Sequence, residues 1–558
     1  MLVAIFLGVC ALTAEADNDS CGRHGGKEVT LSQAVSLPFE RMTRFRVRYD
    51  AASLWTSYAL TIKYQAGAQE NQLISASIKY TSFASKKSVS ETNIDGESVL
   101  LLFGSEFVGE AQFGCLEIRA YNRSVPNAKL EASLQQLTFT WTSSIVLCLA
   151  TSAIALVTAT MIASMYFANN YLRHAVSAFA SSWNLFRALA VVGLVEVFGS
   201  LPGLVTAIDI YVNQFLGGNQ DVCNFDFRAF FVYDKLPALN AIISHFPYYA
   251  AAFLLYAVVE MQARALKTSK EDNKVWHHQL GRILAISMFF LGVRSLGYHI
   301  CPGWPTIPLD YSGSSSYALI ALFLLYAQRD VIDLSLPAIE MTLVTLTVLA
   351  YVGTVYAETS WLAVVYGLFV GYACSTQIKP LYKWVYDGMI PRFNRTQYAV
   401  RYSPATQIVA SLSEMVLSVS NLAYWYYEYY SGAIVFVQSL QSTVFYLSLS
   451  AMAVDFVVRL RYKQASIPIC IAAFTFMAFI RAAFYFFDLP NSSGGSLPWE
   501  SRDAGPPSIV GVFQAHDVWH ILSAVFLCAM GLLVVFFEDA GVASIVSGPS
   551  LKGATHSK

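Results

Sequence analysis

The chain has 558 residues, of which 55% are hydrophobic and only 13% are charged, and its formal net charge is −1. This balance excludes a soluble enzyme and predicts a polytopic α-helical membrane protein. A net charge so close to zero gives no indication of an acidic or a basic partner.

The first residues predict a secretory signal peptide at 1–16. An apolar run from Leu2 to Leu12 is followed by Ala14-Glu15-Ala16, a small-x-small cleavage pattern. Cleavage near Ala16 leaves the mature N-terminus outside the cell or in a lumen.

Residues 17–143 predict a small extracellular or lumenal domain of the β-sandwich type. Short alternating segments separated by Gly, Ser and Asn indicate strands at 45–49, 58–64, 73–81, 99–103, 115–120 and 130–141. Cys21 and Cys115 lie in this domain, and an oxidising compartment favours a disulfide between them. Sequons predict glycosylation at Asn122 and, much further along the chain, at Asn491.

One predicted strand alternates cationic and apolar residues. Strand geometry places Arg44, Arg46 and Arg48 on the same face. A row of guanidinium groups binds phosphates, so this face is a candidate contact for nucleic acid. The alternative interpretation is a solvated face whose charge is offset by acidic residues on neighbouring strands.

About eleven apolar segments, each long enough to cross a bilayer, follow this domain. They lie at 144–167, 185–208, 238–261, 281–299, 313–328, 336–356, 360–378, 405–426, 432–458, 466–487 and 517–538. A short cytosolic loop at 168–184 separates the first span from a ten-helix domain at 185–540, and 541–558 is a cytosolic tail. Lys and Arg concentrate in the connections that this topology places inside, as the positive-inside rule requires.

Several charged residues fall within these spans. A charge in lipid is costly, so each is expected to face the bundle interior or to reach the interface, mostly in packing or helix-end pairs. Among them are Glu196, Arg294, Glu340, Glu414, Asp455 and Arg481.

Histidines gather at the outer end of the predicted bundle. His516 and His520 are four residues apart, which places both imidazoles on one face of a helix. His299 ends the fourth span on the same side of the membrane, and Asp310 begins the fifth. Three histidines with one position left for water are typical of catalytic zinc. For the pair His516 and His520 alone, the alternative is two interfacial histidines capping a membrane helix.

Four motifs in this region carry a resemblance to a known family. They are Gly218-Asn219-Gln220-Asp221-Val222-Cys223, Asn240-Ala241-Ile242-Ile243-Ser244, Tyr298-His299-Ile300-Cys301-Pro302 and His516-Asp517-Val518-Trp519-His520. They resemble the systemic-RNAi-defective (SID) transmembrane family, which is linked with double-stranded RNA transport and cholesterol uptake. That family is similar in turn to the alkaline ceramidases and the progestin/adiponectin receptors, in which Ser, Asp and three His surround a zinc ion.

The resemblance implies a role for each residue of the site. His299, His516 and His520 would bind zinc, and Ser295 and Asp310 would contact the water on the metal. In a hydrolytic site Asp310 is then the general base, and Ser295 holds the water or donates to the developing oxyanion. Asp517, next to His516, is expected to orient a ligand from outside the coordination shell.

A second disulfide is predicted between Cys223 and Cys301. Both lie in predicted outer loops, whereas Cys148, Cys374, Cys470 and Cys528 fall within spans and Cys10 is removed with the signal peptide. The bridge would stiffen the chain two residues beyond His299.

Three functions stay open from the sequence. The resemblance predicts uptake of double-stranded RNA, with sterol binding as a further property. The histidine group predicts a zinc-dependent lipid amide or ester hydrolase, or else a structural zinc that clamps three spans. The expected partners are double-stranded RNA, membrane lipids such as cholesterol or sphingolipid, and a second copy of the chain. The expected location is the plasma membrane or a lysosomal or endosomal membrane.

Overall fold

The computed structural model describes the strands between residues 28 and 137, and residues 183–226, 238–267, 275–303, 305–328, 336–355, 404–431, 436–461, 467–487, 501 and 513–539. The chain divides into two compact units. One combines Met1–Ser143 with Asp209–Leu239 and Ser493–Pro506, and the other combines Ser144–Ile208, Asn240–Ser492 and Pro507–Lys558.

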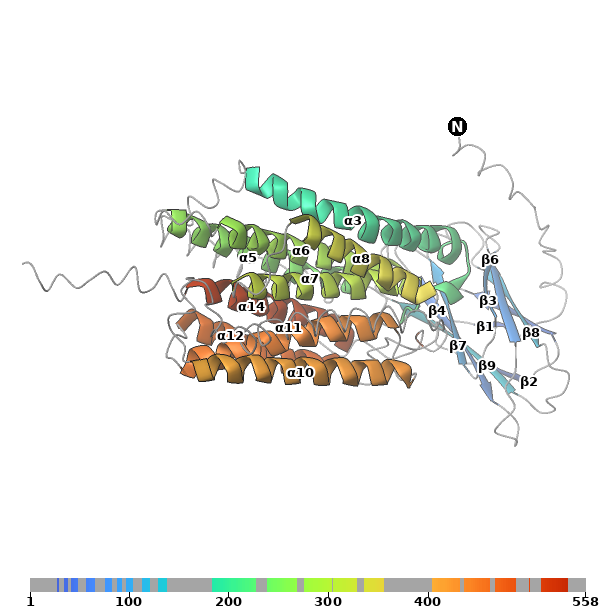
Figure 1. The fold of residues 1–558 in the computed structure, drawn as a ribbon. Coiled ribbons are helices and arrows are strands. Elements are labelled where there is room, and N and C mark those ends of the chain that lie inside the picture. The colour runs from blue at the N-terminus through green and yellow to red at the C-terminus, as the bar shows by residue number, and fades with distance from the viewer. Residues whose placement is uncertain are drawn as a thin grey trace, which may run out of the picture. The chain divides into compact units, whose positions relative to one another are not determined.

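The described strands of the first unit form two sheets, whose elements are drawn in Figure 1. The five-stranded sheet has the order β1-β3-β8-β5-β6 and the four-stranded sheet the order β2-β9-β4-β7. The strands are β1 Glu28–Val29, β2 Val35–Pro38, β3 Met42–Arg48, β4 Ser57–Gln65, β5 Ala76–Ser82, β6 Ser88–Thr92, β7 Glu97–Phe103, β8 Phe113–Ala120 and β9 Lys129–Leu137.

Alternation along the strands creates a buried face on the four-stranded sheet. Tyr58, Leu60 and Ile62 recur at every second position of β4 and are all buried. On the paired strand β9, Ala132 and Leu134 are buried in the same way. Each of the six predicted strands overlaps a strand of the structure.

Several features predicted from the sequence lie outside the described residues. They are the signal peptide at 1–16, Cys21 and both glycosylation sequons, Asn122 and Asn491. Cys115 lies in β8. Its pairing with Cys21 stays a prediction, because Cys21 is not among the described residues. So does the location of the domain outside the membrane.

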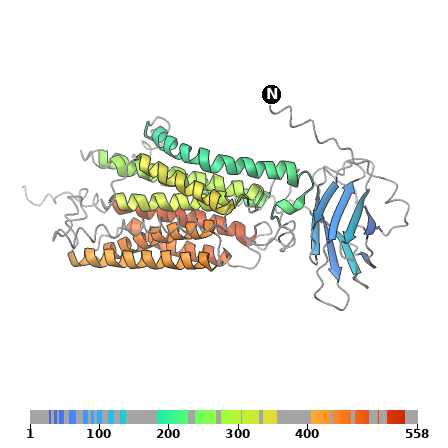
Figure 2. The ribbon, with the colours of Figure 1, turned by 45° about the vertical axis from the view of Figure 1, so that its right-hand side comes forward.

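The second unit is a bundle of long helices, which Figures 1 and 2 show lying alongside one another with α3 at one edge and α10 at the opposite edge. The helices are α3 Trp183–Asp209, α4 Leu239–Ile243, α5 Phe246–Lys267, α6 Val275–Ile300, α7 Ile307–Gln328, α8 Leu336–Val355, α10 Pro404–Tyr430, α11 Phe436–Arg461, α12 Ile467–Phe487 and α14 Ala515–Asp539. The chain that follows α3 belongs to the first unit and contains a π-helical turn, η2 Ile210–Phe215, and a short 3₁₀ helix, η3 Gln220–Val222.

Nine of the eleven predicted spans coincide with helices in the described part of the chain. The segments 144–167 and 360–378, nearly all of the loop 168–184, and the tail 541–558 lie outside it. Within the described residues, six helical segments are long and apolar enough to cross a membrane. These are Val195–Phe215, Leu239–Ala263, His278–Ile300, Phe436–Arg461, Ile467–Phe487 and Ala515–Phe537. The full number of eleven stays a prediction.

The core of the bundle lies between α5, α6, α7 and α14, where Leu255, Leu284, Tyr317 and Met530 are fully buried. The Tyr317 hydroxyl satisfies its donor by bonding to the carbonyl oxygen of Leu527 at 2.7 Å. The outer helices differ, because large apolar side chains such as Phe474 on α12 are 76% exposed. A helix that is apolar on its inner and outer faces is typical of a lipid environment.

Candidate metal centre

The site begins with an interruption between α4 and α5. Pro247 lies one turn after Ile243, and a proline has no backbone N–H to donate to the carbonyl four residues earlier. The helix therefore stops at Ile243 and restarts at Phe246, leaving Ser244 and His245 in a turn. This turn lies within the candidate span Leu239–Ala263.

The interruption determines how His245 is held. Its backbone N–H bonds to the Ile242 carbonyl at 3.2 Å, so the carbonyl of Ala241 accepts from side chains instead. The Ser244 hydroxyl and His245 Nδ1 each lie 2.6 Å from that oxygen. A carbonyl oxygen only accepts, so Nδ1 carries the proton and the lone pair of a neutral His245 ring is on Nε2.

Imidazoles from α6 and α14 converge on the same point. His299 Nε2 lies 2.8 Å from His520 Nε2, and His520 Nε2 lies 3.1 Å from His516 Nε2. In the described part of the chain, the ligand atoms of His245, His299 and His520 all lie within 4.8 Å of one another, and all three residues are buried. His516 is partly exposed at the edge of this group.

The spacing of these nitrogen atoms fits a transition-metal ion. Four ligands at about 2.0–2.1 Å around a tetrahedral zinc lie roughly 3.3 Å apart, and the separations of 2.8 and 3.1 Å are close to that value. Neutral imidazole suits zinc better than it suits calcium or magnesium. The Nδ1 atoms of His516 and His520 are buried and have no hydrogen-bond partner among the described residues.

Ser295 and Asp310 lie beside the imidazoles. Ser295 Oγ is 2.8 Å from His245 Nε2 and also hydrogen-bonds to the Asp310 carboxyl. Ser295 and His299 are on α6, one turn apart, and Asp310 is in the first turn of α7. Asp310 is partly exposed whereas Ser295 is buried.

Asp517 does not contact an imidazole through any described hydrogen bond. Its Oδ2 atom accepts from Asn240 Nδ2 at 2.8 Å and from the backbone N–H of Gln514 at 2.9 Å. The carboxylate therefore caps the first turn of α14 and fastens it to α4. Its expected role in orienting His516 stays a prediction, and the bonds indicate that it positions the whole helix end.

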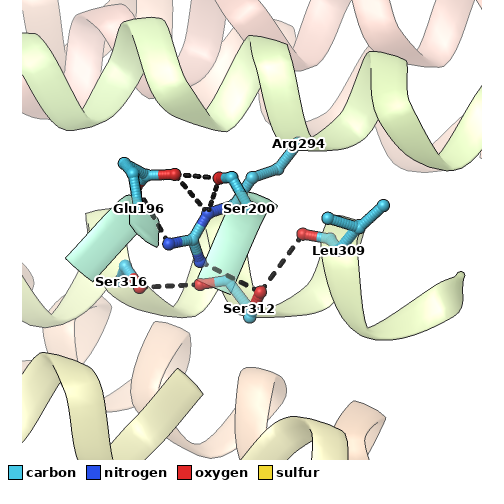
Figure 3. A network of polar contacts seen from close by, with 6 residues as sticks. All are labelled: Glu196, Ser200, Arg294, Leu309, Ser312 and Ser316. Carbon is cyan, nitrogen blue, oxygen red and sulfur yellow. Dashed lines mark hydrogen bonds and ion pairs between the residues drawn. The ribbon is translucent and has the colours of Figure 1, made fainter. Parts of the chain in front are cut away.

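A buried ion pair sets the position of α6 next to the site. Arg294, 1% exposed, donates from Nε and Nη2 to the two carboxylate oxygens of Glu196 on α3, each at 2.9 Å (Figure 3). Its Nε also lies 2.9 Å from Ser200 Oγ, and its Nη1 donates to Ser312 on α7 at 3.0 Å. Three helices are thus joined at the residue that precedes Ser295.

Two other groups of predicted site residues lie outside this centre. Arg44, Arg46 and Arg48 are in β3, where Arg44 is paired across the sheet with Glu117 of β8. That acidic neighbour is what the alternative, a charge-offset strand face, requires. Cys223 and Cys301 are both disulfide-bonded, which agrees with the predicted bridge, although the identity of the partners stays a prediction.

His245 was not predicted from the sequence. A lone histidine in an apolar segment has no spacing pattern that marks it as a ligand. Two signals were nevertheless present along the chain. Pro247 predicts a helix break next to His245, and the predicted topology places the start of the third span on the same side of the membrane as His299.

Long apolar helices with exposed apolar side chains outside and paired polar groups inside define a polytopic α-helical membrane protein. The family model described as "dsRNA-gated channel SID-1" matches residues 143–545. The chain therefore belongs to this family, as its motifs predicted.

Similar proteins support the same assignment. SID1 transmembrane family member 1 from Mus musculus is 26% identical over 371 residues, and the protein of that name from Homo sapiens is 25% identical over 367 residues. Each match covers 62% of this chain and 44% of the relative. The chain thus matches somewhat less than half the length of these relatives.

Proposed function

We propose that the protein takes up double-stranded RNA and moves it across a membrane. The observation that carries this proposal is the family match, which runs through all of the described helices from α3 to α14. The match covers the helical bundle. The strand domain lies before residue 143, where the match begins.

The proposed contact for RNA is the arginine row of β3. Double-stranded RNA is recognised mostly through its shape and its phosphates, and three guanidinium groups along a strand provide phosphate contacts without reading sequence. In the register of the sheet, Glu117 of β8 is opposite Arg44, and Glu28 of β1 is opposite Arg46. Arg48 is opposite Phe113, which carries no charge.

Uptake of labelled RNA tests the proposal. Cells that express the chain should accumulate double-stranded RNA above mock-transfected cells, with little gain for duplex DNA of equal length because the A-form shape and the 2′-hydroxyl groups are missing. Equal accumulation in expressing and mock cells would contradict the transport function.

Two triple variants test the arginine row, one that removes the positive charge and one that keeps it. Changing Arg44, Arg46 and Arg48 together to Gln should weaken RNA binding and lower the salt slope by roughly one unit for each phosphate that is no longer neutralised. The same three changes to Lys keep the charge and should preserve most of the slope. If the Gln variant binds like the parent across a salt series, the row is an ordinary solvated face.

A second candidate function is the hydrolysis of a lipid amide or ester at the metal centre. It is favoured by the contact between Ser295 and Asp310 directly beside the imidazoles. Bound zinc would supply Lewis acidity and activate a water molecule. The Asp310 carboxylate would take the proton from that water and return it to the leaving amine or alcohol as the C–N or C–O bond breaks. The Ser295 hydroxyl would donate to the developing oxyanion.

Asp310→Asn separates hydrolysis from simple metal binding. The variant should keep its zinc, measured by elemental analysis, because no imidazole is changed. It should lose hydrolysis of a ceramide or a phospholipid in detergent micelles by about 10²–10⁴-fold, the contribution of a general base. A variant as active as the parent would show that Asp310 is not the base.

A further inference from the structure

His245 is a fourth imidazole in a group for which three had been expected. Its ring centroid lies 4.2 Å from that of His520 and 5.1 Å from that of His299. It is fully buried. Its ligand atom lies within 4.8 Å of the ligand atoms of both His299 and His520.

The protonation of His245 leaves its metal-binding atom free. Nδ1–H is committed to the Ala241 carbonyl at 2.6 Å, so Nε2 of the neutral ring has only a lone pair to offer. A backbone carbonyl bonded to the opposite ring nitrogen is the arrangement that commonly orients a histidine ligand of a metal. The Ala241 carbonyl is available for this bond because the backbone N–H of His245 bonds to the Ile242 carbonyl instead.

While Asp310 is ionised, Ser295 cannot donate a proton to both of its neighbours. A hydroxyl has one proton to donate, and Ser295 Oγ lies against two acceptors, His245 Nε2 and the Asp310 carboxylate. When the proton goes to Asp310, the lone pair of His245 faces the oxygen of Ser295 with no proton between them. A buried acceptor without a donor is costly, and a cation among the imidazoles relieves that cost.

We propose that His245 is a ligand of the metal and that, together with His299, His516 and His520, it forms a four-imidazole site. This inference rests on the metal centre proposed above and specifies its chemistry. Catalytic zinc usually has three protein ligands and leaves one position for water, whereas structural zinc has four. With His245 bound, the centre is closed and holds the turn between α4 and α5 together with α6 and α14. Lipid hydrolysis would then require His245 to leave the ion.

Cobalt substitution provides a test that does not depend on activity. The purified full chain is stripped with a chelator, reloaded with Co²⁺ and titrated with azide, which binds to cobalt only where a coordination position is open. The parent should show a tetrahedral visible spectrum that azide does not change. His245→Ala should still bind cobalt through the remaining three imidazoles, at least roughly tenfold more weakly, and azide should shift its spectrum.

Two further variants exclude an indirect effect. Ser295→Ala removes the hydroxyl that competes for the lone pair of His245, so it should stay insensitive to azide and bind cobalt at least as tightly as the parent. His278→Ala changes a buried histidine of α6 outside the group and should behave as the parent. If His245→Ala does not fold, His245→Gln replaces it with a polar side chain, and azide sensitivity is again expected.

Each outcome bears on the proposal. A parent protein that binds one cobalt ion and responds to azide as His245→Ala does would overturn the role of His245 while leaving the metal centre intact. A parent protein that binds no cobalt at all would overturn the centre, and the four-imidazole site with it. If azide also shifts the spectrum of Ser295→Ala, His245 is not a ligand but a positioning residue for Ser295.

Discussion

The buried ion pair between Arg294 and Glu196 gives the sharpest prediction of stability. Glu196→Ala removes the carboxylate partner of Arg294, whose side chain is only 1% exposed in the parent protein. The acceptors that remain near it, Ser200 and Ser312, are both neutral. A buried cation with neutral acceptors is poorly compensated, so the variant should be strongly destabilised.

The magnitude follows from the two bonds that the variant cannot form. Glu196 accepts two charge-assisted hydrogen bonds, each 2.9 Å long. At about 1.5–3 kcal/mol for each, their sum agrees with the roughly 3–5 kcal/mol lost when one partner of a buried pair is removed. The ratio of folded to unfolded protein should fall by about two to three and a half orders of magnitude, since about 1.4 kcal/mol corresponds to a factor of ten.

A double-mutant cycle distinguishes a true pair from two independent residues. Glu196→Ala, Arg294→Met and the combined variant are unfolded in detergent by titration with dodecyl sulfate, and the helical signal is followed by circular dichroism. Arg294→Met in the Glu196→Ala background removes the uncompensated charge, so the combined variant should be more stable than Glu196→Ala alone. Destabilisation of the combined variant equal to the sum of the two single changes would refute the argument.

Two further predictions concern packing and the disulfide. A Cβ added at Gly531 would lie 2.5 Å from the Tyr317 hydroxyl oxygen, so Gly531→Ala should lower thermal stability by about 1–3 kcal/mol. The matched control is Gly193→Ala, where a Cβ meets nothing within 4 Å, and no loss is expected. Cys223→Ser should lower the free energy of unfolding by about 2–4 kcal/mol, because it removes a disulfide. Peptide mapping of the parent without reduction should recover Cys223 linked to Cys301. Free thiols at both positions would contradict the predicted bridge.

The strands and helices were predictable where their patterns are local. The alternation of apolar residues in β4 and the apolar length of α12 or α14 are visible in a short window of sequence. The shortest strands were not predicted: β1 has 2 residues, β2 has 4 and β6 has 5. Segments this short have too few residues to establish a period, and neighbouring strands decide whether they pair.

The site was predictable only where a spacing or a topology rule applied. His516 and His520 share a helix face, and the predicted membrane topology placed His299 on the same side of the membrane. The partner of Arg294 was not predictable, because Glu196 lies 98 residues earlier on another helix. The position of His245 could not be predicted, because it depends on a local break in the helix. Tertiary contacts decide how that break orients the ring.

The imidazoles of the metal centre lie on helices that are synthesised at very different times. His520 is 221 residues later in the chain than His299, so at about 5–20 residues per second α6 is complete roughly 10–45 s before its counterpart on α14 is translated. During that interval the nascent bundle lacks the helix that packs against α5, α7 and α12. Until α14 is inserted, the faces of α5 and α7 that it covers in the folded bundle have no helix packed against them.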